Sequence, residues 1–158
     1  MASFRDYDEV MLKRIKYVSR FAKPLSADEI DKLAEQSTRN NKEHGITGVL
    51  MTSGGMFFQV IEGEKEHVDA LYGNIINDKR HRDVLLLSVE EGVADRLFPD
   101  WSMKKVDLDA GSNVRTEPLK MLLTNIIQQR HLIDESSKAL ERAVWREMVD
   151  AGSKSKSR

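Results

Sequence analysis

The sequence contains no cysteine, and none of its apolar runs approaches the roughly 20 residues that a membrane-spanning helix requires. Without cysteine the chain has no disulfide, no thiolate metal site, no cysteine nucleophile and no photochemistry that attaches a thiol to a cofactor. The four histidines show no metal-ligand spacing, so we expect no bound metal. Residues 1–10 are rich in charge and lack the apolar stretch of a secretory signal, which favours a cytoplasmic protein.

An excess of one charge and the common nucleotide or nucleophile motifs are also missing. The 25 basic and 26 acidic residues give a formal net charge of −1, so neither nucleic acid nor a membrane is expected as a partner. There is no GxGxxG, P-loop, GxSxG or HExxH signature. The 158 residues suffice for one domain but leave no room for a second, catalytic domain. We therefore expect a protein that is not an enzyme.

What the chain does contain is an ordered series of strand and helix patterns. Ser26 and Glu29 form a capping box that starts a helix reaching about Asn41. Residues 84–90 are a nearly continuous apolar run, which favours a central strand covered on both faces. The order predicts an α+β, ferredoxin-like sandwich (βαββαββ) with two helices on one face of the sheet. The expected strands are 13–19, 45–53, 56–63, 84–90 and 101–107, and the expected helices are 26–41 and 68–77.

The glycine pair at residues 54–55 predicts a tight hairpin, because glycine supplies the positive φ values that such a turn needs. A two-residue turn there fixes the register, pairing Leu50 with Gln59 and Gly48 with Ile61. Gln59 is consequently expected on an apolar face of the sheet.

Residues 118–150 contain two further amphipathic patterns, which we interpret as helices on or near the other face of the sheet. The first follows Pro118, and Leu140, Val144 and Met148 mark the second. The expected organisation is a domain at 11–108, a linker at 109–117, a helical cap or output segment at 118–150 and a disordered tail at 151–158.

Gln59 is the most informative residue, because a primary amide in an apolar face is costly unless hydrogen-bond partners meet it. Tyr17, on the first strand, is a candidate partner, and a purely structural Tyr-Gln hydrogen bond is one interpretation. Ser37 and Asn41 extend the inner stripe of the first helix with polar side chains, which favours a ligand instead. A planar heterocycle rich in carbonyl and imide groups would satisfy all four side chains.

Other polar and aromatic residues allow two interpretations each. Asn40 either ends the first helix or contacts the ligand. Residues 78–81 form either a solvated turn or a site where Arg80 pairs with phosphate. Trp101 and Met103 are typical core residues and indicate no function by themselves.

Five segments follow one another along the chain: Ile15-Lys-Tyr-Val-Ser19; Arg39-Asn-Asn41 with Gly45-Ile-Thr-Gly48; Phe58-Gln-Val-Ile-Glu-Gly63; Asp78-Lys-Arg-His81; and Phe98-Pro-Asp-Trp-Ser-Met103. Together they resemble the BLUF family of small FAD-binding blue-light sensors, over about residues 13–108. Chance could produce any one segment, whereas all five on the same order of strands and helices are hard to obtain otherwise. The resemblance is to a short, single-domain member.

The resemblance implies FAD bound non-covalently between the two helices, with FMN or riboflavin as alternatives because Asn74 stands where the family often has a basic residue near the phosphate. Tyr17 would donate an electron and a proton to photoexcited flavin, and the Gln59 amide would then rotate or tautomerise to give a red-shifted signalling state. The expected cofactor-binding residues are Ser37, Asn40, Asn41, Gln59, Asp78, Arg80 and His81, and Trp101 and Met103 are expected to transmit the signal, with either one facing the flavin.

The resemblance also implies a downstream signalling protein as partner, since the segment after Asp107 is unlike an enzymatic effector; self-association into a homo-oligomer is a further option. Two other functions stay open. One is a flavin-dependent oxidoreductase, which no nucleotide fingerprint supports. The other is a ferredoxin-like interaction module without cofactor, in which Tyr17 and Gln59 satisfy each other. An absorption spectrum before and after blue light separates the three.

Overall fold

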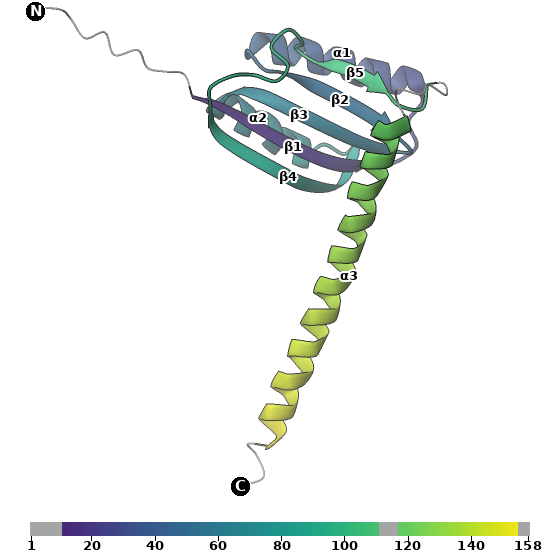
Figure 1. Cartoon of the computed structure of the whole chain (residues 1–158), viewed down its shortest axis with the longest axis vertical. Helices are drawn as coiled ribbons and strands as arrows, with labels where there is room; N and C mark the ends of the chain where they lie inside the picture. Colours follow the sequence, from purple (N-terminus) through teal and green to yellow (C-terminus); the bar gives the residue numbers. More distant parts are fainter. Residues whose placement is uncertain (1–10, 111–116, 155–158) are drawn as a thin grey trace, which may run out of the picture. The chain divides into compact units, whose positions relative to one another are not determined.

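The computed structural model describes residues 11–110 and 117–154 (Figure 1). The chain divides into two compact units, residues 1–112 and 113–158, and each is described by itself. The described part of the first unit is a five-stranded sheet with two helices, and that of the second is one long helix.

The first unit has the strand and helix order that the sequence predicts. The strands lie in the order β4-β1-β3-β2-β5, and all neighbours are antiparallel except β2 and β5, which are parallel. The α+β, ferredoxin-like fold is confirmed. Its elements are β1 (Leu12–Phe21), α1 (Ala27–Glu43), β2 (Thr47–Ser53), β3 (Met56–Glu64), α2 (Lys65–Ile76), β4 (His81–Val93) and β5 (Lys104–Asp107).

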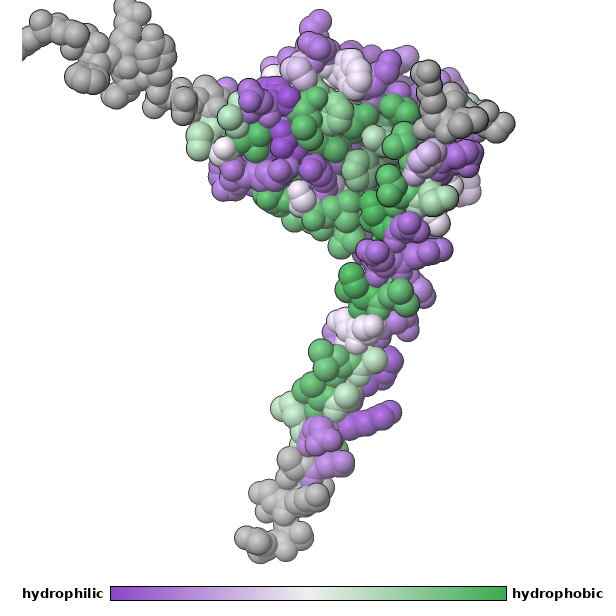
Figure 2. All heavy atoms as spheres, viewed as in Figure 1, coloured by the Kyte–Doolittle hydropathy of each residue, from purple (hydrophilic) through white to green (hydrophobic). Residues whose placement is uncertain are grey.

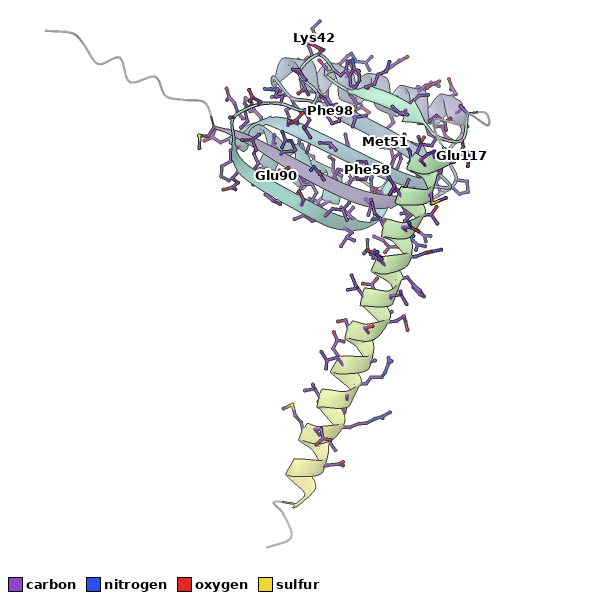
Figure 3. All side chains as sticks on the ribbon, viewed as in Figure 1. Lys42, Met51, Phe58, Glu90, Phe98 and Glu117 are labelled. Atoms are coloured by element: carbon purple, nitrogen blue, oxygen red, sulfur yellow. The ribbon has the colours of Figure 1, made fainter. Side chains whose placement is uncertain are left out.

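Both helices pack on one face of this sheet, as predicted. Their buried side chains join those of the strands in a single hydrophobic cluster, which includes Leu33 of α1, Val68 and Ile75 of α2, Ile15 and Tyr17 of β1, Leu50 of β2, and Phe57 and Ile61 of β3. Because successive strand side chains alternate between faces, the neighbouring Met51 and Phe58 lie on the opposite face. That face is turned toward the viewer in Figure 3, and Figure 2 shows apolar side chains gathered on it.

Helix α1 begins with the predicted capping box. The Glu29 amide donates to Ser26 Oγ at 3.2 Å, and the Ser26 amide donates to Glu29 Oε2 at 2.8 Å. Two backbone donors at the helix start are thereby satisfied. The buried stripe of α1 becomes polar at its end, where the side chain of Asn41 is almost completely buried.

The hairpin between β2 and β3 also has the predicted register. Gly54 and Gly55 have φ values of +56° and +75°, which side chains with a Cβ rarely adopt. Leu50 faces Gln59 across the strands, and β1 places Tyr17 opposite Gln59 on the other side of β3. The register set by the turn thus places the Gln59 side chain on the helix-covered face of the sheet, on a strand that lies between β2 and β1.

Two strand predictions are wrong. Strand β4 is an edge strand rather than a central one, and Leu86, Leu87 and Val89 are 36–44 % exposed. The apolar run predicts a strand correctly, but pairing over long sequence distances decides which strands occupy the centre, and β1 and β3 do. The last strand is also shorter than expected, because Trp101 and Met103 precede its first residue, Lys104.

In the second unit, the prediction of two helices is wrong, because α3 runs without a break from Glu117 to Lys154. No glycine or proline lies between Pro118 and Gly152, so nothing forces the helix to end. Residues 151–154 of the predicted tail are helical; residues 155–158 and most of the expected linker lie outside the described residues.

Apolar and polar side chains line opposite sides of α3 (Figure 2). Within the described part of the chain, no helix is both long and apolar enough to span a membrane.

Candidate functional site

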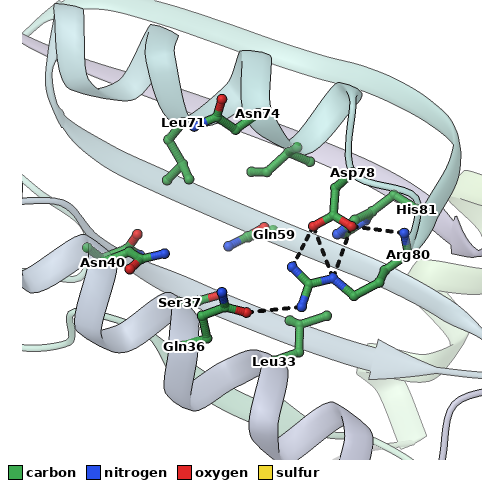
Figure 4. A pocket seen from close by; sticks show the side chains of 12 residues that line it. Leu33, Gln36, Ser37, Asn40, Gln59, Leu71, Asn74, Asp78, Arg80 and His81 are labelled. Carbon is green, nitrogen blue, oxygen red and sulfur yellow. Dashed lines mark hydrogen bonds and ion pairs between the residues drawn. The ribbon is translucent and has the colours of Figure 1, made fainter.

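A cavity lies between α1 and α2 and has Gln59 of β3 in its floor (Figure 4). Its volume is about 130 Å³, and its mouth is open to solvent. The structure brings together all seven residues that the sequence analysis assigns to cofactor binding. They are Ser37, Asn40 and Asn41 from α1, Gln59 from β3, and Asp78, Arg80 and His81 from the turn after α2 and the start of β4.

The remaining lining residues were not predicted as binding residues. Leu33, Leu71 and Ile75 form apolar walls, and Gln36 and Asn74 add two amides. The helical spacing of Leu33 and Ser37 could have indicated the lining, since Gln36 precedes Ser37 at the edge of the same stripe.

Tyr17 and Gln59 form the predicted hydrogen bond, in which Tyr17 Oη donates to Gln59 Oε1. The tyrosine is fully buried and the glutamine is 5 % exposed. Among the described residues, the acceptor for Gln59 Nε2 is the thioether of Met103, at 3.6 Å. A thioether accepts hydrogen bonds weakly, so this buried amide keeps donor capacity toward the cavity. A heterocycle with carbonyl and imine acceptors would meet that need.

Burial raises the pKa of Tyr17 above its ordinary value, and the nearby Tyr72 and Asp78 raise it further. The Tyr72 and His81 rings lie 5.8 and 6.2 Å from the Tyr17 ring, centre to centre. The phenol therefore stays protonated over the whole physiological range and is available as a hydrogen-bond donor to Gln59.

His81 lies at the inner end of the cavity. Its Nδ1 is 2.7 Å from Ser19 Oγ, and its ring centre is 4.7 Å from that of Phe57. Burial lowers the pKa of His81, an effect that Asp78 opposes only in part. The imidazole is consequently neutral at pH 7 and adds a polar but uncharged group beside Tyr17.

Asp78 and Arg80 form an ion pair at the mouth of the cavity. Arg80 Nη2 donates to Asp78 Oδ2 at 2.6 Å, and Arg80 Nη1 donates to Gln36 Oε1 of α1 at 3.2 Å (Figure 4). The guanidinium lowers the pKa of Asp78, and the carboxylate raises the pKa of Arg80. The guanidinium thus joins the turn after α2 to α1 across the entrance.

Asn41 lines the cavity and also holds another part of the fold. Its Nδ2 donates to the backbone oxygen of Ser102 at 2.8 Å, so it connects the end of α1 to the segment that precedes β5. Asn40 is exposed, and its backbone oxygen lies 2.8 Å from His44 Nδ1.

Met103, rather than Trp101, is on the inside in this structure. Met103 is 8 % exposed and contacts Gln59, whereas Trp101 is 44 % exposed and stacks on Phe98 with 5.8 Å between ring centres. Trp101 therefore lies outside the set of residues that surround the cavity.

The ferredoxin-like fold, with a buried amide at a cavity between two helices, defines a ligand-binding domain, and comparison with known proteins names its family. The model of the BLUF family, described as sensors of blue light using FAD, matches residues 12–104. The chain belongs to this family. It is a blue-light sensor that uses a flavin.

Similar proteins carry this domain in longer chains. Photoactivated adenylate cyclase subunit beta of Euglena longa is 34 % identical over 118 residues, which are 73 % of this chain and 13 % of that protein. A solved bacterial light-regulated adenylyl cyclase is 40 % identical with a TM-score of 0.74, over 78 % of this chain and 36 % of the other. The solved BlrP1 of Klebsiella pneumoniae with FMN and cyclic diGMP is 32 % identical with a TM-score of 0.60, over 72 % and 30 %. This chain therefore spans about one eighth of the curated relative.

Proposed function

We propose that the chain senses blue light through FAD bound non-covalently in the cavity, with Tyr17 and Gln59 as the photoactive pair. The observation that carries the proposal is the buried hydrogen bond from Tyr17 Oη to Gln59 Oε1 beside the cavity. Bound flavin supplies the absorption of blue light and an excited state that accepts an electron and a proton. The phenol is the neighbouring group that holds a transferable proton, and the amide of Gln59 is its direct acceptor.

The Gln59 amide has two ways to bond in this surrounding. In the observed orientation its oxygen accepts from Tyr17, and its nitrogen faces the thioether of Met103. Rotation by half a turn, or a change of tautomer, would reverse donor and acceptor on both sides. Loss and return of the Tyr17 proton would allow the Gln59 amide to rotate or tautomerise, because the deprotonated phenol oxygen can only accept a hydrogen bond. A new hydrogen bond from Gln59 to the flavin would then shift the absorption to longer wavelength.

The cofactor would be held mainly from the two sides of the cavity. Ser37, Asn40 and Asn41 offer hydroxyl and amide groups from α1, and Asp78, Arg80 and His81 offer charged and neutral polar groups from the opposite side. These are complementary to the alternating donors and acceptors of a flavin ring.

A cationic depression supports a flavin nucleotide rather than riboflavin. It adjoins the cavity and shares Leu33, Gln36 and Arg80 with it. It adds Lys23, Lys32 and one carboxylate, Glu29, so its lining has a net positive charge. Phosphate would find positive charge there without the basic residue that Asn74 replaces. Calorimetric titration with FAD, FMN and riboflavin tests this: the affinity of the two nucleotides should exceed that of riboflavin, and equal affinities would contradict the role of the lysines.

An absorption spectrum of the purified chain in darkness and after blue light tests the main proposal. A flavin spectrum that moves to longer wavelength under light and returns in darkness is expected. Asn74→Leu is a matched control, because Asn74 lines the cavity without contacting Tyr17, and its light response should persist. A chain that takes up no added flavin refutes the proposal, and steady consumption of a reductant in darkness would favour an oxidoreductase.

The signal would pass to a separate protein rather than to a catalytic centre in this chain. The support is the exposed apolar side of α3, where Leu122, Ile133, Leu140, Val144 and Met148 are each at least half exposed. Such a stripe suits a helical partner or a second copy of the chain. A cytoplasmic location is part of the same proposal.

A further inference from the structure

Glu62 is an almost fully buried carboxylate that the light-sensing pair does not use. It is 1 % exposed and lies on β3, the strand that carries Gln59. Its carboxylate accepts three hydrogen bonds, from Arg14 Nε at 2.8 Å, from the Leu97 amide at 2.9 Å and from the Phe98 amide at 2.7 Å. Two of these donors belong to the backbone of the segment between β4 and β5.

Arg14 completes a buried ion pair with Glu62 and reaches the same segment. Its Nη2 donates to the backbone oxygen of Asp95 at 2.8 Å, and its Nη1 donates to Glu90 of β4 at 3.2 Å. A buried ion pair contributes little to the free energy of unfolding compared with a well-packed apolar pair, so stability alone does not explain its presence. Here the consequence is geometric: the pair fixes the path of residues 95–98.

The far end of this segment is held near the cavity. The Gly48 amide donates to the Trp101 oxygen at 2.8 Å, and Asn41 Nδ2 donates to the Ser102 oxygen. The thioether of Met103 then contacts the Gln59 amide.

Phe98 links the two ends of the segment. Its amide bonds to Glu62, and its ring stacks on Trp101 with an angle of 16° between the ring planes. Contacts therefore lead from Glu62 through Phe98 to Trp101, and the backbone continues from Trp101 to Met103, whose thioether contacts the amide of Gln59.

We propose that Glu62 is a positioning residue for the Gln59 switch. By holding the backbone of Phe98, it keeps Trp101 outside and the thioether of Met103 against the Gln59 amide. The inference rests on the proposed function, in which Gln59 rearranges under light. Without the Glu62 hydrogen bonds that anchor the segment, the arrangement with Met103 against Gln59 is less stable. The return of the protein to this arrangement in darkness is therefore slower.

The test compares Glu62→Gln with Glu90→Gln in the flavin-loaded chain. Glu90 bonds to the same arginine and contacts no backbone amide of the segment, which makes it a matched control. Glu62→Gln should keep a normal dark flavin spectrum and recover about tenfold more slowly, since charge-assisted hydrogen bonds are replaced by neutral ones. Glu90→Gln should recover at the rate of the unchanged chain.

Phe98→Leu is the second variant, because it keeps the ion pair and removes the aromatic stack. Recovery should slow about threefold, in proportion to the modest energy of such a stack. If Glu62→Gln fails to fold because Arg14 loses its buried ionic partner, Phe98→Leu decides the question. Unchanged or faster recovery in the variants that fold, or equal slowing in Glu90→Gln, overturns the proposal.

Acrylamide quenching of Trp101 tests the anchor without light, in a Trp145→Phe background. Glu62→Gln and Phe98→Leu should change the quenching of Trp101, whereas Glu90→Gln should leave it unchanged. An absent photocycle in the unchanged chain would contradict the proposed function, while identical quenching in all variants would contradict the anchor alone.

Discussion

Replacement of Gln59 by leucine separates the structural from the photochemical part of the Tyr17–Gln59 pair. Leucine fills nearly the space of glutamine, so no large cavity results, but the phenol of Tyr17 loses its acceptor in a place that water does not reach. A buried donor without a partner costs about 1–3 kcal/mol. Part of that cost is offset, because the variant also lacks the Gln59 amide nitrogen, which is buried against a weak acceptor, the thioether of Met103.

We therefore expect Gln59→Leu to lower the free energy of unfolding of the flavin-free protein by about 1–2 kcal/mol. Tyr17→Phe leaves the Gln59 oxygen without its donor and should cost about 1 kcal/mol. The double variant should be no less stable than Gln59→Leu alone, which corresponds to a coupling energy of about 1 kcal/mol between the two side chains.

Urea denaturation followed by circular dichroism gives the four free energies, and the difference spectrum between light and darkness gives the photochemistry. In flavin-loaded Gln59→Leu the shift to longer wavelength should be absent, because no amide remains to rearrange. Asn74→Leu controls for the loss of an amide from the cavity wall. Additive losses in the denaturation series, or a retained spectral shift in Gln59→Leu, would refute the reasoning.

Three further outcomes follow from the structure. Tyr17→Phe should bind flavin yet lose the light-driven shift, and a full shift in its difference spectrum would exclude the assigned role. In Gly48→Ala the new Cβ would lie 2.0 Å from the Val60 backbone oxygen, so β2 and β3 must separate; we expect a loss of about 3 kcal/mol, measured by denaturation, and a loss below about 1 kcal/mol would contradict the strand spacing. Burial lowers the pKa of His81, so below about pH 6.5 its imidazole is protonated more readily in the unfolded chain than in the folded chain. The contribution of neutral His81 to the free energy of unfolding is therefore fully present above about pH 6.5 and decreases as the pH falls below that value. Thermal unfolding of the unchanged chain and His81→Gln between pH 7 and about pH 5 should diverge, and parallel curves would count against this assignment.

Local rules in the sequence determined much of the fold and of the cavity. The two glycines at 54–55 fix the hairpin register, so the position of Gln59 opposite Leu50 follows from residues within one turn of each other. The helix start at Ser26 is equally local. Ser37 and Asn41, at the polar end of the inner stripe of α1, line the cavity.

Contacts between distant parts of the chain decided the rest. An apolar run such as Leu85–Val89 is compatible with a central or an edge position, and only the pairing of β1 with both β3 and β4 places it at the edge. The orientation of Met103 was open, because the segment before β5 is irregular and its path depends on bonds to residues about 60 positions away.

By itself, the sequence determined the order of the elements, the hairpin register and the positions of Ser37, Asn41 and Gln59 at the cavity, because turns, caps and periodicity act over a few residues. The tertiary structure decided which strand lies at the edge, that Met103 and not Trp101 contacts Gln59, and that Glu62 and Arg14 form a buried pair 48 residues apart. These features arise from long-range pairing and the exclusion of water, which no short stretch of sequence specifies alone.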